Sequence, residues 1–297
     1  MINFNRFTLA IVVSDIHIGT EYSRIDEFTA FLKNIYLMKV DNKLPFLKAL
    51  IILGDLFDLN ASSFEDLCFN RQYFRIYKIL DKIKDTNIET IITLGNHEIS
   101  TSGFYNLRFS ERKEQFAKQF RSNYFLYNFL TEENLCQYLI LTSDENNTYL
   151  GLIDSIHDDP FRWIHLANRT FLNQECYFMT HGYQFEDKDL HHLITGFWNA
   201  GKFLSEGWKR VVTSLWREYK NTFDRGDYSR FYKNITTSHE DIDSPFSHII
   251  FGHTHNSEIK DTTKINIGCW LNDKDPNYLE IHVDGACNLC KIFINNN

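Results

Sequence analysis

This 297-residue sequence lacks several features that are typical of membrane-spanning, secreted or repeat proteins. No apolar run reaches the ~18 residues that a membrane-spanning helix needs. The start, MINFNRFTLAIVVSD, has a short apolar run and no small-residue cleavage site, so we interpret it as a strand and not a signal peptide. Without a Pro-rich linker, a low-complexity tract or an internal repeat, we expect a single domain over residues 1–297.

The sequence also has neither a disulfide framework nor an excess of positive charge. Six cysteines are scattered along the chain, which suits reduced thiols in a cytosol. Cys287 and Cys290 form a lone C-x-x-C, which we interpret as two residues of a late strand because no second pair completes a zinc site. The formal net charge of −8 makes the chain a poor general binder of nucleic acid. We therefore expect a cytoplasmic protein, with nucleic acid a less favoured partner than small molecules.

The chain contains instead many apolar residues in short runs. Hydrophobic residues make up 43% of the sequence, and 26 of them are phenylalanine, which is enough for a sizeable core. Short β-branched runs within 8–17, 49–55 and 90–98 predict strands, and apolar spacings of three and four predict helices at 25–36 and 74–83. This alternation is typical of parallel strands joined by helical crossovers.

The later part of the chain is richer in predicted strands. Two strands are expected within 137–154, and others within 176–182 and 247–255. The runs KINIGCW, YLEIHV and CKIFI predict short C-terminal strands. The expected fold class is therefore α/β, with two mixed β-sheets packed as a sandwich and flanked by helices.

A helical insertion or cap is expected at residues 186–240. The apolar stripe over 188–235 has helical spacing, and glycines predict that it is kinked or broken. Residues 196–235 contain eight basic and four acidic side chains, a local excess of four positive charges. One interpretation is an ordinary insertion packed on the core. The other is a cap beside the active site, whose tryptophans and basic residues contact an amphiphilic substrate or a membrane surface peripherally.

Polar side chains of one kind follow the predicted strands, where each strand ends. Since the carboxyl ends of strands converge in open α/β sheets, we expect these side chains to share one crevice. They are carboxylates, imidazoles and one amide, a set that suits Mn, Fe or Zn. Seven of them are candidate metal ligands: Asp15, His17, Asp55, Asn96, His181, His253 and His255.

The number of candidate ligands favours two metal ions over one. A single octahedral ion has no room for seven protein ligands and a water molecule, whereas two ions sharing a bridging carboxylate do. Two metals about 3.5–4 Å apart suit in-line displacement at phosphorus, in which a bridging hydroxide attacks. We therefore expect two divalent cations, with Mn²⁺ the first choice and Fe or Zn as alternatives.

At this point the sequence resembles the calcineurin-like metallophosphoesterases. Five blocks in the right order carry the resemblance: D-x-H (15–17), G-D-x-x-D (54–58), G-N-H-E (95–98), H-G (181–182) and G-H-T-H (252–255). The resemblance implies a β-sandwich flanked by helices and a hydrolase of phosphodiester, phosphomonoester or pyrophosphate bonds.

The resemblance also implies a role for each matched residue. One metal would be held by Asp15, His17, Asp55 and His255, and the other by Asp55, Asn96, His181 and His253. Asp55 would bridge the two. His97 would face the scissile phosphate and stabilise charge or protonate the leaving oxygen, while Asp58 would orient the His97 ring.

The subgroup within this superfamily is less well defined. SDIHIG and GDLFD are similar to both the UDP-2,3-diacylglucosamine diphosphatases and the nucleases of the superfamily, and the ending INIGCWLNDKDPNYLEI is similar to the former. Two positions depart from the diphosphatase pattern: His97 stands where those enzymes carry Arg, and Cys269 where they carry Ser. Leu59 directly after G-D-x-x-D, where serine/threonine protein phosphatases carry Arg, argues against that branch.

Three function classes stay open on the sequence alone. The first is a pyrophosphatase acting on a nucleotide-linked or lipid-linked phosphate ester. The second is a DNA or RNA nuclease, and the third is a metal-free binding scaffold. Arg24, Arg71 and Arg108 are candidates for contact with a substrate phosphate, and a solvated salt bridge is the alternative for each.

Overall fold

The computed structural model describes residues 2–58, 61–62, 66–67, 70–99, 135–153, 162–183, 247–260 and 263–292. The chain divides into two units, residues 1–181 with 246–297, and residues 182–245. All of the elements below belong to the first unit. The helical insertion expected at 186–240, its apolar stripe at 188–235 and Arg108 lie outside the described residues.

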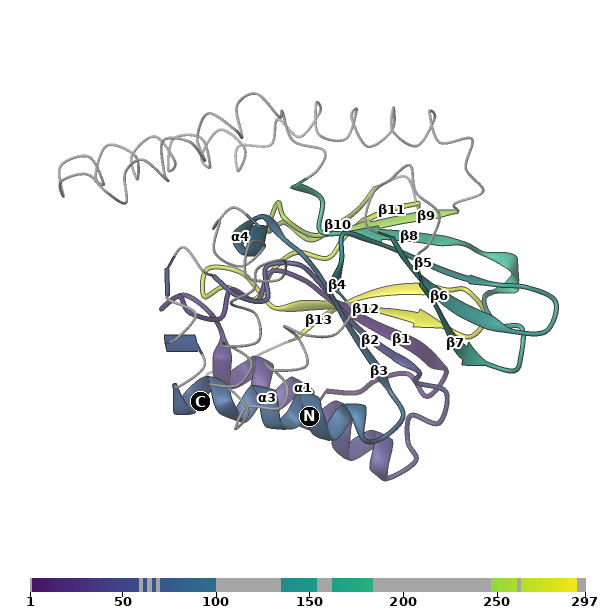
Figure 1. The fold of residues 1–297 in the computed structure, drawn as a ribbon, viewed down its shortest axis with the longest axis horizontal. Helices are drawn as coiled ribbons and strands as arrows, with labels where there is room; N and C mark the ends of the chain where they lie inside the picture. The colour runs from purple at the N-terminus through teal and green to yellow at the C-terminus, as the bar shows by residue number, and fades with distance from the viewer. Residues whose placement is uncertain are drawn as a thin grey trace, which may run out of the picture. The chain divides into compact units, whose positions relative to one another are not determined.

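A six-stranded mixed sheet forms one half of the first unit, in the order β13-β12-β1-β2-β3-β4 (Figure 1). Strands β1 to β4 run parallel to one another, whereas β12 is antiparallel to both β1 and β13. The strands are β1 (Thr8–Val13), β2 (Ala49–Leu53), β3 (Glu89–Thr93), β4 (Leu135–Cys136), β12 (Asn277–His282) and β13 (Cys287–Lys291).

The second sheet has seven strands in the order β10-β11-β9-β8-β5-β6-β7. The pairs β8–β9 and β9–β11 are parallel, and the other pairs are antiparallel. The strands are β5 (Tyr138–Ser143), β6 (Thr148–Ile153), β7 (Arg162–Ala167), β8 (Tyr177–Thr180), β9 (His248–Phe251), β10 (Glu258–Lys260) and β11 (Lys264–Asn266). A short 3₁₀ helix, η1 (Leu172–Gln174), precedes β8.

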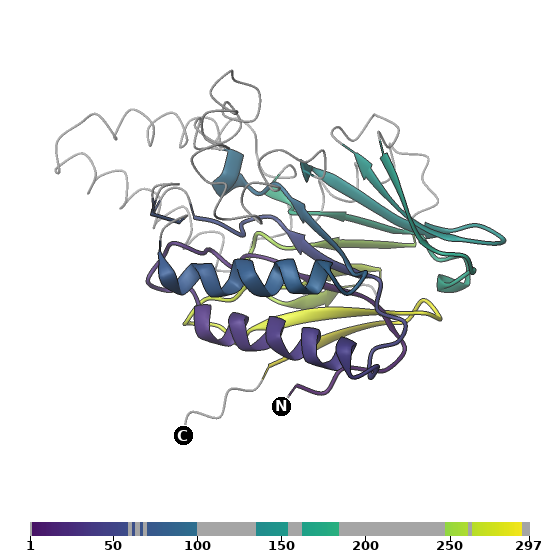
Figure 2. The same cartoon turned by 60° about the horizontal axis from the view of Figure 1, so that its bottom comes forward.

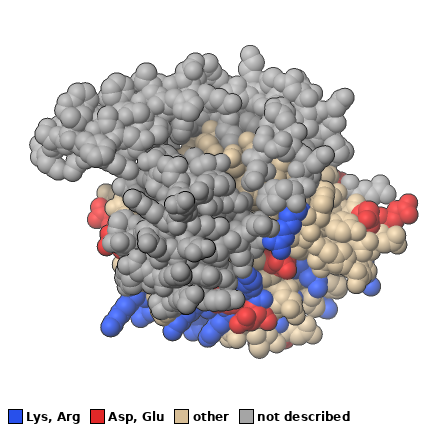
Figure 3. Space-filling model, viewed as in Figure 1, with Lys and Arg blue, Asp and Glu red and all other residues tan. Residues whose placement is uncertain are grey.

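The helices cover the outer face of the six-stranded sheet. Helix α1 (Ile25–Val40) and helix α3 (Arg71–Lys84) lie side by side there (Figure 1 and Figure 2), and α4 (Asn96–Ile99) is a single turn after β3. Helix α3 is amphipathic, with Tyr73, Ile76 and Leu80 buried while its basic side chains are exposed. In Figure 3, Lys and Arg side chains gather along the lower edge, where Figure 1 places these two helices.

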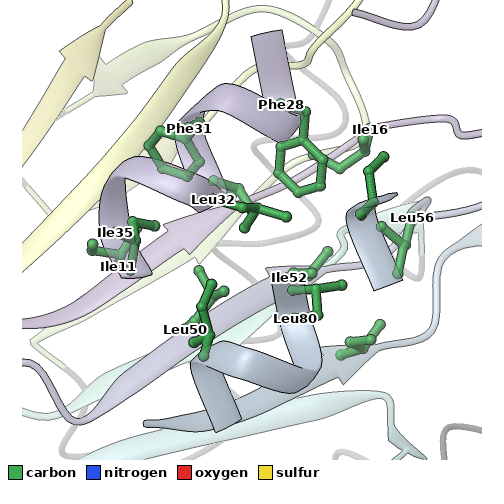
Figure 4. Packing of buried hydrophobic residues seen from close by; sticks show 14 of the residues in the cluster. Ile11, Ile16, Phe28, Phe31, Leu32, Ile35, Leu50, Ile52, Leu56 and Leu80 are labelled. Atoms are coloured by element: carbon green, nitrogen blue, oxygen red, sulfur yellow. The ribbon is translucent and has the colours of Figure 1, made fainter. Parts of the chain in front are cut away.

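Two apolar cores result from the alternation of side chains along the parallel strands. Ile11 of β1 and Ile52 of β2 pack with Phe28 and Leu32 of α1, a cluster that Figure 4 shows from close by. The intervening residues point into a second core shared with strands of the other sheet. Strands buried on both faces account for their nearly continuous apolar sequence.

The observed architecture confirms the fold class that the sequence predicts. The second core contains Val12 and Ile51 of one sheet together with Leu139 and Ile250 of the other, so the two mixed sheets pack face to face. Both predicted helices are present. Among the helices of the described ranges, none combines the length and the apolar character that crossing a bilayer requires.

Candidate metal centre

The seven candidate ligands all follow the ends of strands in the two packed sheets. Asp15 and His17 come after β1, Asp55 after β2 and Asn96 after β3. His181 directly follows β8, and His253 with His255 follow β9. Because β1, β2 and β3 are parallel to one another, and β8 is parallel to β9, these ends deliver their side chains to common edges.

The first group of converging atoms lies around His17. The Nε2 atom of His17 is 3.1 Å from Nε2 of His255 and 3.8 Å from Oδ1 of Asp15. Oδ1 of Asp15 is 3.3 Å from Nε2 of His255. Oδ2 of Asp55 lies 3.8 Å from Nε2 of His17 on the other side. Asp15, His17 and His255 therefore lie close enough together that they could hold a metal ion.

The second group lies around His181, which is fully buried. Its Nε2 atom is 3.0 Å from Oδ1 of Asn96, 3.2 Å from Oδ2 of Asp55 and 3.3 Å from Nδ1 of His253. The same oxygen of Asp55 thus faces His17 in the first group and His181 in the second. One atom common to both groups is what a bridging ligand requires.

The atoms around Nε2 of His181 require a positive charge among them. Nδ1 of His181 lies 2.8 Å from the carbonyl oxygen of Leu53, which only accepts, so this nitrogen carries a proton. Nε2 faces oxygens of Asn96 and Asp55. A neutral ring would present a lone pair to these oxygens, so either a second proton or a metal ion lies among them. A backbone carbonyl bound to the other ring nitrogen is the usual arrangement for a metal-bound imidazole.

Oδ1 of Asp15 supports the same conclusion. It is buried and accepts no hydrogen bond from the described part of the chain, although three imidazole nitrogens lie within 4.0 Å of it. A buried carboxylate oxygen without a donor is costly unless it is paired or coordinates a metal. The donor set of nitrogen and oxygen atoms, with no thiolate, suits divalent Mn, Fe or Zn.

Each of the two aspartates is oriented by a backbone amide. His253 N donates to Oδ2 of Asp15 and His97 N donates to Oδ1 of Asp55, both at 2.9 Å. The hydroxyl group of Ser14 lies against the same Oδ2 of Asp15. In both carboxylates one oxygen accepts from the backbone and the other faces the imidazoles. The backbone hydrogen bonds therefore orient Oδ1 of Asp15 and Oδ2 of Asp55 toward the centre.

The backbone turns sharply at the candidate ligands. Asp15, His17, Asp55, His253 and His255 have φ between 48° and 68°, the left-handed region that non-glycine residues rarely adopt. Such conformations cost on the order of 1–3 kcal/mol each and persist where the surrounding structure holds them, which is common at functional sites. This geometry lets residues that follow a strand turn their side chains back into one centre.

Two glycines of the motifs are required by close approach of the backbone to these side chains. A Cβ atom on Gly95 would overlap Oδ1 and the backbone nitrogen of Asp55. A Cβ atom on Gly252 would overlap the hydroxyl group of Ser14 and Oδ2 of Asp15. The glycine in G-N-H-E and that in G-H-T-H therefore leave room for the aspartates of other strands.

His97 and Asp58 lie beside the two groups. Nδ1 of His97 is 3.0 Å from Oδ1 of Asp58, and Nε2 of His97 is 3.9 Å from Oδ2 of Asp55. The other oxygen of Asp58 lies 3.5 Å from Nδ1 of His17. Asp58 thus contacts the Nδ1 atoms of both His97 and His17. These contacts direct the Nε2 atoms of the two rings toward the centre.

Sequence reasoning gave no role to Glu98, which the structure places at the base of the centre. This buried carboxylate accepts hydrogen bonds from the backbone amides of Asp55, Phe57 and Gly95 at 2.9–3.0 Å. It joins the loop that follows β2 to the loop that follows β3. The one signal in the sequence was its place in the G-N-H-E block, because an acidic residue directly after Asn96 and His97 needs partners if it is buried.

The carboxylates and imidazoles shift one another's pKa values. Burial opposes ionisation of Asp15, but the imidazoles of His181, His17 and His255 hold its pKa well below the ordinary value. Burial likewise opposes protonation of His181, but Asp55 and Asp15 raise its pKa to about 9. Burial and the nearby charge of Asp55 raise the pKa of Glu98 to about 7, against its backbone hydrogen bonds. In the metal-free chain, protons on the imidazoles therefore balance the carboxylates that a cation would otherwise neutralise.

The candidate phosphate-binding arginines are placed less favourably. The guanidinium of Arg24 donates to the carbonyl oxygens of Leu271 and Asn272 and pairs with Glu27, so it braces the loop after β11. Arg71 is an exposed residue at the start of α3.

Comparison with known proteins agrees with this geometry. Residues 9–257 match the calcineurin-like phosphoesterase family, a range that includes all seven candidate ligands, Asp58 and His97. The chain belongs to this family. The protein is therefore a phosphoesterase, and its Asp and His groups support a dinuclear metal hydrolase.

One solved structure similar to this phosphoesterase is the crystal structure of a dimetal phosphatase from Danio rerio. It is 7% identical, the alignment covers 96% of each chain, and the TM-score is 0.46. No curated protein matches the chain in sequence. The family match does not separate the diacylglucosamine-diphosphatase subgroup from others, so that resemblance stays a prediction.

Proposed function

We propose that this phosphoesterase binds two divalent metal ions, one through Asp15, His17, Asp55 and His255, and one through Asp55, Asn96, His181 and His253. The observation that carries the proposal is the position of Asp55 Oδ2, which faces both His17 and His181. When bound, such a pair of ions neutralises phosphoryl charge and lowers the pKa of water toward 7. Mn²⁺ is the expected metal, with Fe or Zn as alternatives.

His97 is proposed as the residue that assists the leaving group. Asp58 accepts from its Nδ1, which leaves Nε2 directed at the centre. Burial opposes a charged ring, but Asp55 and Asp58 raise the pKa of His97, which favours a proton on Nε2. From there it donates that proton to the leaving oxygen, and Asp58 keeps the ring in position throughout.

The substrate proposed is a phosphate ester or pyrophosphate of a small, nucleotide-linked molecule. The net charge of −8 argues against a nucleic-acid backbone as the main substrate. A metal-free scaffold is disfavoured because all seven ligands of the family pattern are present and brought together.

A hydrolysis panel with the Mn²⁺-loaded protein tests this proposal. The panel contains bis-p-nitrophenyl phosphate, p-nitrophenyl phosphate, UDP-linked sugars and single-stranded DNA. We expect turnover of the small esters or the UDP-linked sugars, its loss with EDTA and its recovery with Mn²⁺. Hydrolysis restricted to DNA would favour the nuclease alternative, and a protein that binds no metal and hydrolyses nothing would favour the scaffold. Full activity of an Asp55→Ala variant would contradict the bridging role.

Lipid contact through residues 188–235 and a cytoplasmic location are further predictions. A flotation assay with vesicles of neutral and of anionic lipid tests the first of these. Failure of the protein to float with either vesicle would contradict the peripheral membrane contact.

A further inference from the structure

A polar pocket of about 430 Å³ opens directly beside His255. Its described lining comes from the loop after β9, the segment between β11 and β12 with the first residue of β12, the last residue of β13, and the residue before α1. Apart from the imidazole of His255, the described lining has no aromatic or aliphatic side chain. Small-molecule pockets are usually lined mainly by apolar side chains, so this composition restricts what the pocket can bind.

Lys274 differs from the other cations of this pocket. Arg24 pairs with Glu27 at 3.2 Å, and Lys291 lies 3.8 Å from Asp275. The ammonium group of Lys274 donates to the neutral amide oxygen of Asn256 at 3.1 Å, and no carboxylate of the described ranges lies within ion-pair distance of it. Since Lys274 and His255 line the same pocket, this positive charge shares the pocket with a candidate metal ligand.

Asn277 adds an unsatisfied acceptor to the same lining. Its side chain is 4% exposed, and its Nδ2 donates to the carbonyl oxygen of Asp275 at 2.6 Å. Its Oδ1 is buried and accepts no hydrogen bond from the residues that the structure describes. A buried acceptor without a donor costs about 1–3 kcal/mol, which a hydroxyl group of a ligand would remove.

We infer that this pocket is the substrate subsite for a hydroxyl-rich group that carries a second phosphate, the glycosyl side of a diphosphate diester. The inference rests on the proposed function, because it places the scissile phosphorus at the neighbouring centre. Lys274 binds the non-scissile phosphate. The amides and carboxylates, among them Asn277 and Asp273, accept from or donate to sugar hydroxyls. Apart from the ring of His255, the described lining offers an acyl chain or a stacked nucleobase no aromatic or aliphatic side chain to contact.

Kinetics with two substrates test the inference. UDP-glucose carries a diphosphate and a sugar, whereas p-nitrophenyl phosphate has neither. We expect Lys274→Ala to lower kcat/KM for UDP-glucose roughly tenfold to a hundredfold more than for p-nitrophenyl phosphate, the size of one charge-assisted hydrogen bond. The loss lies mainly in KM, and Lys274→Arg recovers part of it. Lys43→Ala, which removes an exposed lysine paired with Asp41, is the matched control and leaves both substrates unchanged.

Binding measured without turnover separates failure of the inference from failure of the proposed function. Isothermal titration of the Mn²⁺-loaded protein with UDP-glucose should show binding that Lys274→Ala weakens by a similar factor. If the protein hydrolyses p-nitrophenyl phosphate but neither binds nor hydrolyses UDP-glucose, the subsite is wrong and the proposed function stands. Equal losses on both substrates in Lys274→Ala also overturn it. If no ester is hydrolysed, the proposed function fails, and the titration still decides whether the pocket binds.

Discussion

At the scale of single residues, the centre depends on carboxylates whose two oxygens make different contacts. In Asp15 and Asp55 one oxygen accepts from a backbone amide, and the other faces imidazoles. This division holds the ligand oxygens in place before any ion binds. Preorganised ligands lose little conformational freedom on binding, so the side chains around the aspartates matter as much as the aspartates themselves.

His97→Ala should lower kcat by roughly 10²–10⁴, the usual contribution of a general acid. The loss should be smallest for p-nitrophenyl esters, whose leaving oxygen needs little protonation. Steady-state kinetics on p-nitrophenyl phosphate and on an alkyl phosphate ester measure the difference. Equal losses on both esters would mean that His97 binds the phosphate and does not protonate the leaving group.

Glu98→Gln is expected to weaken metal binding without removing a ligand. The glutamine has one oxygen that accepts, where the carboxylate accepts from three backbone amides on two loops. A loss of roughly 10–100-fold in Mn²⁺ affinity is expected, as for other groups that hold metal ligands in place. Isothermal titration calorimetry with Mn²⁺ measures this loss of affinity. An affinity equal to that of the wild type would show that the two loops keep their positions without the Glu98 carboxylate.

At the scale of helices and strands, the sequence predicted the elements that are buried and failed at the exposed ones. Strands β1 and β2 are continuous apolar runs because both of their faces are buried, whereas α1 and α3 show apolar residues at helical spacing because one stripe of each is buried. Strand β7 was not predicted, because half of its side chains are exposed at a sheet edge. Strand β10 has three residues, too few for any period to be read.

The candidate centre shows the same limit. The residue types and their places at strand ends were predictable, because motifs at strand ends are local in sequence. The left-handed backbone at five non-glycine candidate ligands was not, since this conformation is uncommon even for Asp and His, the types found there. Nor did local sequence indicate that Glu98 would join two loops, because its partners Asp55 and Phe57 lie about forty residues earlier.

Helix α3 provides a pH-dependent test at this scale. Burial and the charge of Asp85 raise the pKa of Asp81 to about 6, near the C-terminal end of the helix. Its ordinary pKa is 3.8, so the folded chain holds the proton more tightly, and stability present below pH 3.8 is lost as pH rises through 6. Asp81→Asn should therefore raise the free energy of unfolding at pH 8, by less than ~1 kcal/mol because solvent screens this half-exposed group.

Urea unfolding at pH 4 and pH 8 measures this gain, which should be absent at the lower pH. Asp26→Asn is the matched control. Asp26 lies in the first turn of α1, where negative charge stabilises a helix, so its replacement should cost about 0.3–1 kcal/mol. A gain from Asp81→Asn that is equal at both pH values would contradict the assigned pKa.

At the scale of the whole molecule, the centre lies where the two sheets meet, because β1 to β3 belong to one sheet and β8 and β9 to the other. Binding of ions should therefore stabilise the sandwich as a unit. At a Mn²⁺ concentration one hundred times the Kd, the expected gain is ~2.7 kcal/mol. Thermal unfolding with Mn²⁺ and with EDTA measures this gain. Equal unfolding temperatures in the two conditions would mean that the ions do not stabilise the packing of the two sheets.

The central claim is that Asp55 joins two metal ions between the two sheets. Anomalous diffraction from crystals of the Mn²⁺-loaded protein tests it most directly. The account predicts two anomalous peaks that share Oδ2 of Asp55, one beside His17 and His255 and the other beside Asn96 and His181. A single peak, or two peaks of which only one contacts Asp55, would contradict it.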